Sequence, residues 1–174
     1  MATKKKVTPK KDAAKNLSEL FEDSLKDALW AENAVTKALP KMAKNTSSQK
    51  LKKALEEHLA ETKKHVKLLG KVFDSIGKKP KAEKCDAMAG ILEEGEGIIE
   101  ETQPGAVRDA GIIAACQKVE HYEIASYGTM VSYARLLKNK EAVEHLKTIL
   151  KEEKDADKLL SKLATSEINI KAKK

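Results

Sequence analysis

Histidines and carboxylates recur at helical spacing in the stretch EHLAETKKHVKLL. An apolar stripe that includes Leu59 and Val66 runs along the helix that this stretch predicts. His58, Glu61 and His65 lie on or beside that stripe, at offsets of three, four and seven residues. Burying such ionisable side chains without partners is costly. The pattern therefore predicts that other groups meet them inside the protein.

Acids also interrupt the apolar stripes of three other segments with helical periodicity. One such acid would be unremarkable, but together with Glu61 they give every long segment a carboxylate near its middle. The acids are Glu32 in residues 17–43, Glu120 and Glu123 in residues 107–137, and Glu153 and Asp157 in residues 141–164.

These acids lie at matching distances from two expected turns. Glu32 and Glu61 are 14 and 15 residues from a turn centred near residue 46. Glu123 and Glu153 are each 15 residues from a turn centred near residue 138. Equal distances from the turn of an antiparallel hairpin mean equal heights along its axis. We therefore expect the acids to meet in one layer.

Six carboxylates in a buried layer would repel one another, and some would take up protons at neutral pH. Divalent cations would remove this repulsion and would also give the histidines partners. Carboxylate and imidazole ligands suit iron, manganese and zinc, and bridging acids favour two ions. The alternative is a solvated dimer cleft or a polar core of ion pairs. That alternative needs lysine or arginine on the stripes, and residues 17–43, 107–137 and 141–164 have none there.

Other candidate ligands fit a metal site less well. His121 and His145 fall off the stripes, which favours surface or interface roles. Cys116 lies on a stripe, but a soft thiolate suits hard carboxylates poorly, so we interpret it as a small core residue. Two cysteines do not suggest a disulfide framework, and reduced thiols in a cytoplasmic protein are the simplest interpretation.

The elements that must position these residues are helical throughout, because no segment alternates apolar and polar residues as a strand does. Short turns join residues 17–43 to 48–76 and residues 107–137 to 141–164. A long connection containing a shorter, glycine-weakened helix links the two pairs. The sequence thus predicts an all-α four-helix bundle, built from two antiparallel helical hairpins with a long crossover. We place this domain at residues 16–165.

The net charge of +7 belongs to the two ends of the chain. Residues 1–15 carry +5 and residues 166–174 carry +2, so the domain between them is formally neutral. We interpret both ends as flexible lysine-rich tails, either solvating or attracted to nucleic-acid phosphates. No apolar run is long enough to span a membrane, and the N-terminus lacks the apolar region of a secretory signal.

Four motifs carry a resemblance to a known family: WAENAVTKALPKMAK, EEHLAETKKHVKLL, VEHYEIASYGTM and EEKDADKLLSKLA. With them the chain resembles the ferritin-like superfamily and, within it, the YciE/YciF stress-protein family. The resemblance implies a ferritin-like bundle that forms a homodimer, holds a di-iron or di-manganese centre and serves in stress response. It matches Glu32, Glu61, Glu120, Glu123 and Glu153 with the superfamily's ligands.

The match has departures. The superfamily's second and fourth helices usually carry Glu-x-x-His, whereas here Lys64 stands three residues after Glu61 and Ala156 three after Glu153. Whether His58 or His65 binds metal is left open by this order.

The first functional hypothesis for such a two-ion centre is action on O2 or peroxide, or oxidation of ferrous iron. Glu61 and Glu153 would bridge the ions, and Glu120 or Asp157 would move between binding metal and handling protons. Tyr127 would donate a hydrogen bond or supply an electron, unless it is simply a core tyrosine. The alternative is a metal-binding or structural stress protein without turnover, with DNA association through the tails.

Overall fold

The protein was analysed as a computed structural model, which describes residues 8–11 and 13–174. Within those residues the elements are helical and no strand occurs. They are α1 (Leu17–Asn45), α2 (Gln49–Ser75), α3 (Asp86–Glu101), α4 (Ala106–Leu136), α5 (Lys140–Leu163), a π-helical segment (Ala164–Ile168) and α6 (Asn169–Ala172). None of the helices in this described part has the length and apolar character needed to cross a membrane.

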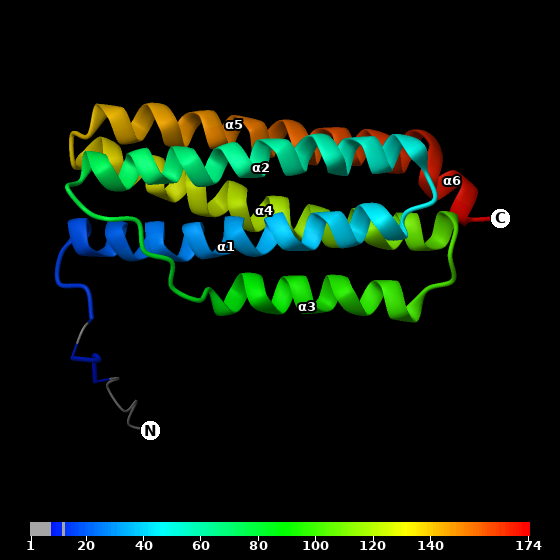
Figure 1. Cartoon of the computed structure of the whole chain (residues 1–174), viewed down its shortest axis with the longest axis horizontal. Helices are drawn as coiled ribbons and strands as arrows, with labels where there is room; N and C mark the ends of the chain where they lie inside the picture. The colour runs from blue at the N-terminus through cyan, green and yellow to red at the C-terminus, as the bar shows by residue number, and fades with distance from the viewer. Residues whose placement is uncertain (1–7, 12) are drawn as a thin grey trace, which may run out of the picture.

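The four long helices form the bundle that the sequence predicts (Figure 1). α1 packs against α2, and α4 packs against α5, so each pair is an antiparallel hairpin joined by a short loop. α2 also contacts α5, and α1 contacts α4, which closes the bundle. The shorter helix α3 is the crossover, and it packs on the outside against α4 and α1.

Local signals fix where the helices begin and end. The side chain of Ser48 accepts a hydrogen bond from the backbone N–H of Leu51 and caps α2. Gly77 follows α2 with a φ of 70°, a conformation that glycine adopts without strain. Asn139 caps α5 through the N–H of Ala142. The caps at Ser48 and Asn139 lie in the two hairpin turns, which are short and set the two hairpins in register.

The crossover helix is more regular than the sequence analysis expects. α3 is continuous over 16 residues despite its glycines. A Cβ on Gly95 would lie 3.3 Å from Cε of Met42, and one on Gly111 of α4 would lie 2.6 Å from Cγ2 of Ile98. Glycine therefore lets α3 approach α1 and α4 closely, and this packing outweighs the weak helix propensity of glycine.

The chain end also differs from the expected flexible tail of residues 166–174. Helix α5 continues through the π-helical segment into α6, and Ile168 is buried in the core. Lys50 of α2 forms an ion pair with Glu167 at 2.7 Å. Burial of the Ile168 side chain holds this segment against the bundle. The charge of the segment does not predict this packing. Of the other expected tail, residues 1–15, positions 1–7 and 12 lie outside the described residues.

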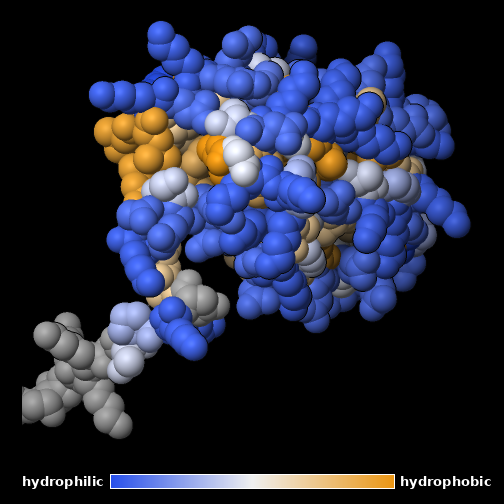
Figure 2. Space-filling model, turned by 60° about the vertical axis from the view of Figure 1, so that its left-hand side comes forward, coloured by the Kyte–Doolittle hydropathy of each residue, from blue (hydrophilic) through white to orange (hydrophobic). Residues whose placement is uncertain are grey.

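The buried apolar side chains form two clusters along the bundle. On α4, for example, one cluster includes Ile112, Ile113, Cys116 and Val119, and the other includes Tyr127, Met130, Val131 and Ala134. Buried acids and histidines occupy the layer between the clusters on all four long helices. The outer surface is largely hydrophilic, with apolar side chains gathered toward one end of the bundle (Figure 2). The fold thus places a charged layer in the middle of an otherwise apolar core.

Candidate metal centre

Six ionisable side chains from the four long helices meet in the middle layer. Each is at most 6% exposed to solvent. They are Glu32 from α1, His58 and His65 from α2, Glu120 and Glu123 from α4, and Glu153 from α5. Of the acids expected to meet in one layer, Glu32, Glu120, Glu123 and Glu153 are therefore in it, together with the two histidines.

The six side chains form two sets of potential ligands that share one member. His58, Glu120, Glu123 and Glu153 each offer an atom within 4.8 Å of the others, and Glu32, His65 and Glu153 do the same. Glu153 belongs to both sets, so its two oxygens lie where one carboxylate can serve two neighbouring positions. This is the arrangement expected of a bridging carboxylate.

His58 connects the acids of one set. Its Nε2 lies 3.3 Å from Oε1 of Glu120 and 3.7 Å from Oε2 of Glu153. Burial by itself would lower the pKa of His58, but the negative charge of Glu120, the adjacent carboxylate of Glu61 and the charge of Glu153 raise it to about 9. In the metal-free protein this imidazole is therefore a cation that balances part of the acid charge.

His65 is held between three carboxylates. Its Nδ1 lies 2.9 Å from Oε1 of Glu153 and 3.5 Å from Oε1 of Glu32, while its Nε2 lies 2.7 Å from Oε2 of Glu152. Burial opposes its charge, but the adjacent carboxylates of Glu153 and Glu32 raise its pKa to about 11. Glu152 orients the ring so that Nδ1 faces the centre, as outer carboxylates do for metal-binding histidines.

Burial and mutual repulsion control the protonation of the acids. Burial raises the pKa of Glu120 and Glu123 well above the ordinary value, and the charge of Glu153 adds to this effect. Burial likewise raises the pKa of Glu32. For Glu153 burial acts in the same direction, but the close contact with His65 and the charges of both histidines lower its pKa overall. Glu153 is thus the acid of the layer that ionises most readily.

The centre fits divalent cations by its unsatisfied atoms. Buried polar side-chain atoms are normally hydrogen-bonded, and exceptions need an explanation. Among the described residues, nine buried side-chain nitrogen or oxygen atoms lack a hydrogen-bond partner. Eight of the nine belong to the six side chains of the centre. Carboxylate oxygens and ring nitrogens gathered without partners in a dry layer are the arrangement that a bound cation satisfies, once the imidazoles give up their protons to it.

Tyr127 is completely surrounded by protein and reaches the centre from the neighbouring apolar cluster. Its hydroxyl donates a hydrogen bond to Oε1 of Glu32. This tyrosine therefore belongs to the apolar cluster and also contacts an acid of the middle layer. Burial, followed by the negative charge of Glu32, raises the pKa of Tyr127 well above the ordinary value. The phenol therefore keeps its proton and remains a hydrogen-bond donor.

Glu61 and Asp157 stand apart from both sets of potential ligands. The side chain of Glu61 is 38% exposed, and its Oε2 lies 3.6 Å from Nδ1 of His58. Asp157 accepts a hydrogen bond from Nε2 of Gln117 at 2.9 Å and lies 3.4 Å from Nε2 of His121. The structure does not place Glu61 in the bridging position expected from the sequence. Its side chain turns toward the edge of α2 instead.

Sequence reasoning missed Glu152, although a signal for it was present. Two adjacent glutamates occur at positions 152 and 153 of α5. The stripe accounts for Glu153, but a histidine inside a bundle also needs an acceptor for its second nitrogen. Looking for that acceptor beside the stripe would have pointed to Glu152.

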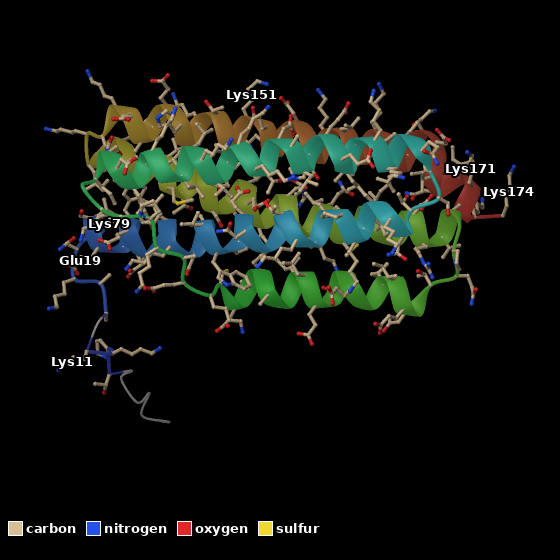
Figure 3. The ribbon with its side chains drawn as sticks, in the orientation of Figure 1. Lys11, Glu19, Lys79, Lys151, Lys171 and Lys174 are labelled. Atoms are coloured by element: carbon tan, nitrogen blue, oxygen red, sulfur yellow. The ribbon has the colours of Figure 1, made fainter. Side chains whose placement is uncertain are left out.

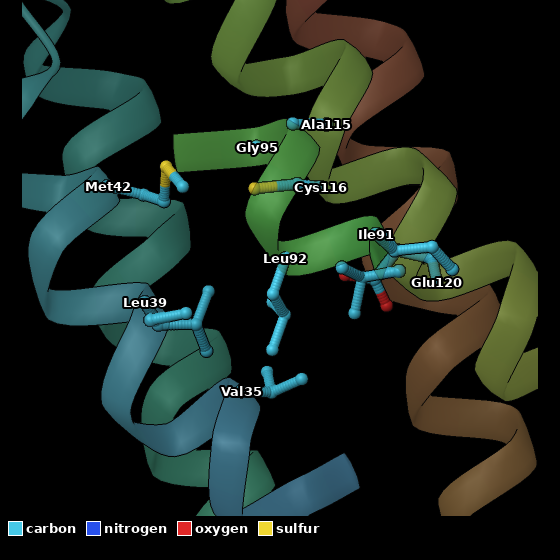
Figure 4. Close-up of a pocket in the computed structure, with 11 residues that line it drawn as sticks. Val35, Leu39, Met42, Ile91, Leu92, Gly95, Ala115, Cys116 and Glu120 are labelled. Atoms are coloured by element: carbon cyan, nitrogen blue, oxygen red, sulfur yellow. The ribbon is translucent and has the colours of Figure 1, made fainter. Parts of the chain in front are cut away.

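An apolar cavity adjoins the centre on the side covered by α3 (Figure 4). Its walls come from α1, α3 and α4, with Cys116 on one wall and Glu120 at its inner end. Burial raises the pKa of the Cys116 thiol to about 12, which leaves it a neutral core side chain, as the sequence analysis interprets it. A second hollow, between α2 and α5, reaches Glu120 and His58 from the opposite side.

Comparison with known proteins assigns the chain to a family. Residues 16–173 match a family described as a domain of unknown function, DUF892. Protein YciF of Escherichia coli strain K12 is 44% identical over 159 residues, which is 91% of this chain and 96% of that protein. These matches confirm the resemblance to the YciE/YciF family.

Solved structures agree with this assignment. The crystal structure of the E. coli stress protein YciF has a TM-score of 0.86 and 43% identity, covering 90% of this chain and 99% of that one. YcfI, a putative structural protein from Rhodopseudomonas palustris, has a TM-score of 0.82 and 39% identity, covering 84% and 94%.

A more distant structure extends the likeness in fold alone. It is described as ferritin-like, diiron-carboxylate proteins from Bacillus anthracis strain Ames, and has a TM-score of 0.66 at 18% identity, covering 87% of this chain and 99% of that one. The predicted ferritin-like four-helix bundle is thereby confirmed. The chain therefore belongs to the DUF892 family, as a homologue of the stress protein YciF with a ferritin-like fold.

Proposed function

We propose that this protein binds two divalent metal ions in the middle layer of its bundle and uses them in redox chemistry. Iron is the first candidate and manganese the second. The reaction would act on O2 or peroxide, or would oxidise ferrous iron. The single observation that carries this proposal is the pair of buried ligand sets that share Glu153 and contain eight unsatisfied side-chain atoms.

The number and type of ligands support a two-ion centre. Di-iron and di-manganese carboxylate bundles use one glutamate from each of two helices and a Glu-x-x-His pair from each of the other two. Four carboxylates and two imidazoles are also what the middle layer offers here. Their distribution differs, because α2 supplies both histidines and no buried acid, and α5 supplies Glu153 and no histidine. The second histidine of α2 thus replaces the histidine that α5 lacks, and the second buried acid of α4 replaces the one that α2 lacks.

Each ion would have its own ligands beside the shared carboxylate. His65 and Glu32 would hold one ion, and His58, Glu120 and Glu123 the other. When bound, iron or manganese supplies one-electron steps and oxygen chemistry that protein side chains cannot provide.

The remaining work falls to the chain's own residues. Tyr127 fixes Glu32 by hydrogen bonding, and Glu152 fixes the ring of His65. Glu120 and Glu123, whose pKa values are raised by burial, would release their protons when a cation takes their place. The same two carboxyls are then suited to accept protons again when charge leaves the centre, with Glu120 the one that also borders both cavities.

The test is anaerobic loading of metal-free protein with Fe²⁺ or Mn²⁺, followed by metal analysis and assays of ferrous oxidation and peroxide consumption. We expect two ions per chain and activity above the rate of the free ions. Glu153→Gln should reduce the stoichiometry, whereas Glu144→Gln, at an exposed acid of the same helix, should not. A protein that binds no metal under these conditions contradicts the proposal.

A non-catalytic metal-binding or structural role is the second candidate. The charged layer separates the two apolar clusters, so ions in it would join the two halves of the core. A purely structural site predicts a large increase in melting temperature on loading, without peroxide consumption or redox-linked absorbance. Comparing melting and turnover on one loaded sample separates the two candidates.

DNA association through the lysine-rich ends is a further proposal that charge alone supports. It predicts binding to duplex DNA at low salt that weakens steeply as salt is added. Removing residues 1–15 should abolish that salt-sensitive binding. If the full-length chain shows no binding at low salt, the idea is wrong.

A further inference from the structure

A hollow of about 140 Å³ between α2 and α5 runs from the protein surface to the metal centre. Leu159, which is 41% exposed, lines its outer part. Glu61 and Ala156 line it from α2 and α5. Its inner part is lined by His58 and Glu120, two of the buried ligands proposed above. The hollow therefore connects solvent with one of the two ion positions.

Three side chains form a graded series along this hollow. The exposed fraction of the side chain alone is 38% for Glu61, 7% for His58 and 2% for Glu120. Oε2 of Glu61 lies 3.6 Å from Nδ1 of His58, and Nε2 of His58 lies 3.3 Å from Oε1 of Glu120. Each step is short enough for one cation to contact two successive side chains.

The innermost members of the series carry polar atoms without partners. Both ring nitrogens of His58 and Oε2 of Glu120 lack hydrogen-bond partners within the described chain. The other acids on the walls are already paired, Glu57 with Lys53 at 3.5 Å and Asp155 with Lys151 at 2.5 Å, along their own helices. In the described structure Glu61 pairs with no lysine, and its ion-pair contact is His58.

We propose that this hollow is the passage by which a divalent cation reaches and leaves the centre, with Glu61 as a transient ligand that hands the ion to His58 and Glu120. The inference rests on the proposed metal-binding function and gives Glu61 a role other than the bridge that the sequence analysis expects.

The cavity under α3 is not suited to the passage of a cation. Its lining is apolar apart from Glu120, and stripping water from a cation there would have no compensating ligands until the ion reached the centre. Substitutions on that side therefore provide matched controls. Glu94 of α3 is an exposed acid whose loss removes the same charge as loss of Glu61. Gly95→Ala places a methyl group against Met42 in the wall of that cavity.

The experiment uses full-length, metal-free protein and Co²⁺, whose visible absorption reports binding to nitrogen and oxygen ligands. Equilibrium titration gives the stoichiometry and Kd, and stopped-flow mixing gives association and dissociation rates. The test variants are Glu61→Gln, which removes the charge, and Ala156→Leu, which narrows the hollow. The control variants are Glu94→Gln and Gly95→Ala.

We expect Glu61→Gln to slow association and dissociation equally, by about tenfold, with two ions bound and Kd unchanged. A group that contacts the ion only in transit lowers the free energy of the transition state for entry and exit, and leaves that of the bound state unchanged. Ala156→Leu should slow both rates in the same way, and the controls should leave them within about twofold of the parent chain.

Three outcomes overturn the proposal, and they can be told apart. Unchanged rates in Glu61→Gln with two ions bound reject the passage but leave the metal centre intact. A weaker Kd caused by faster dissociation makes Glu61 a resident ligand. Failure of the parent chain to bind Co²⁺, Fe²⁺ or Mn²⁺ rejects both the passage and the proposed function.

Discussion

At the scale of single residues, the hydrogen bond from Tyr127 to Glu32 joins the apolar core to the centre. Because Glu32 is buried, loss of its donor leaves a carboxyl oxygen without a partner. We expect Tyr127→Phe to lower the free energy of unfolding of the metal-free protein by about 1–3 kcal/mol. Chemical denaturation in the presence of a chelator measures this change. Tyr133→Phe, at a half-buried tyrosine of the same helix, should cost less than about 0.5 kcal/mol.

The histidines predict how stability depends on pH. With folded pKa values near 9 for His58 and 11 for His65, against an ordinary value of 6.5, their contribution is complete below pH 6.5. It is lost as pH rises through 9 and then 11. The raised pKa values of the buried glutamates act in the same direction, whereas the lowered pKa of Glu153 contributes stability that is lost in acid.

We therefore expect the free energy of unfolding of the metal-free protein to fall between pH 6.5 and 9. Each extra proton on the folded state contributes about 1.4 kcal/mol per pH unit to this slope. Saturating Mn²⁺ should remove or reverse the slope, because ligands lose protons when metal binds. His65→Gln should flatten the metal-free slope, while His121→Gln, at an exposed histidine, should leave it unchanged. Equal slopes with and without Mn²⁺ would contradict a metal centre at these residues.

The sequence predicts which residues share a helix face, but it leaves the rotation of each helix undetermined. At 3.6 residues per turn, His58 and His65 point within about 20° of each other, and Glu61 points about 60° away from His58 and about 40° away from His65, on the same side. Packing of α2 against α1 and α5 turns the histidines inward and leaves Glu61 at the edge. Periodicity could not settle this, because a stripe of that width accommodates either rotation.

At the scale of elements, the helical end of the chain packs on the core through one buried side chain. Ile168 is 2% exposed and Ile170 is 57% exposed, although both lie in the same charged, helical segment. We expect Ile168→Ala to lower the free energy of unfolding by about 2–4 kcal/mol. Ile170→Ala should change it by less than about 0.5 kcal/mol. Comparable effects of the two substitutions in chemical denaturation would contradict packing of this segment.

The long helices were predictable to within about two residues at their ends, because caps and turn residues such as Ser48 and Gly77 mark them. The elements less well predicted depend on contacts distant in sequence. α3 is regular because Gly95 and Gly111 permit close packing, and the end of the chain is helical because Ile168 finds a place in the core. Neither contact leaves a periodic signal in its own segment.

At the scale of the whole molecule, charge is separated into layers. Lysines and acids cover the outside of the bundle (Figure 3), two apolar clusters fill its ends, and the acid–histidine layer crosses its middle. Each of α1, α2, α4 and α5 spans all three parts of the interior, whereas α3 supplies none of the six buried ionisable side chains. Repulsion in the middle layer therefore acts on four helices simultaneously.

This geometry predicts where bound metal changes backbone protection. At a free ion concentration 100 times Kd, each ion should add about 2.7 kcal/mol to the free energy of unfolding. Hydrogen exchange with and without Mn²⁺ should therefore slow around Glu32, His58–His65, Glu120–Glu123 and Glu153, where four helices are tied together. Exchange in α3 should change least, because it rests on the bundle without contributing a ligand. Protection confined to a single helix would mean that cations bind a surface acid and not the shared layer. In Glu153→Gln, which lacks the carboxylate common to both ligand sets, protection should weaken on all four helices together.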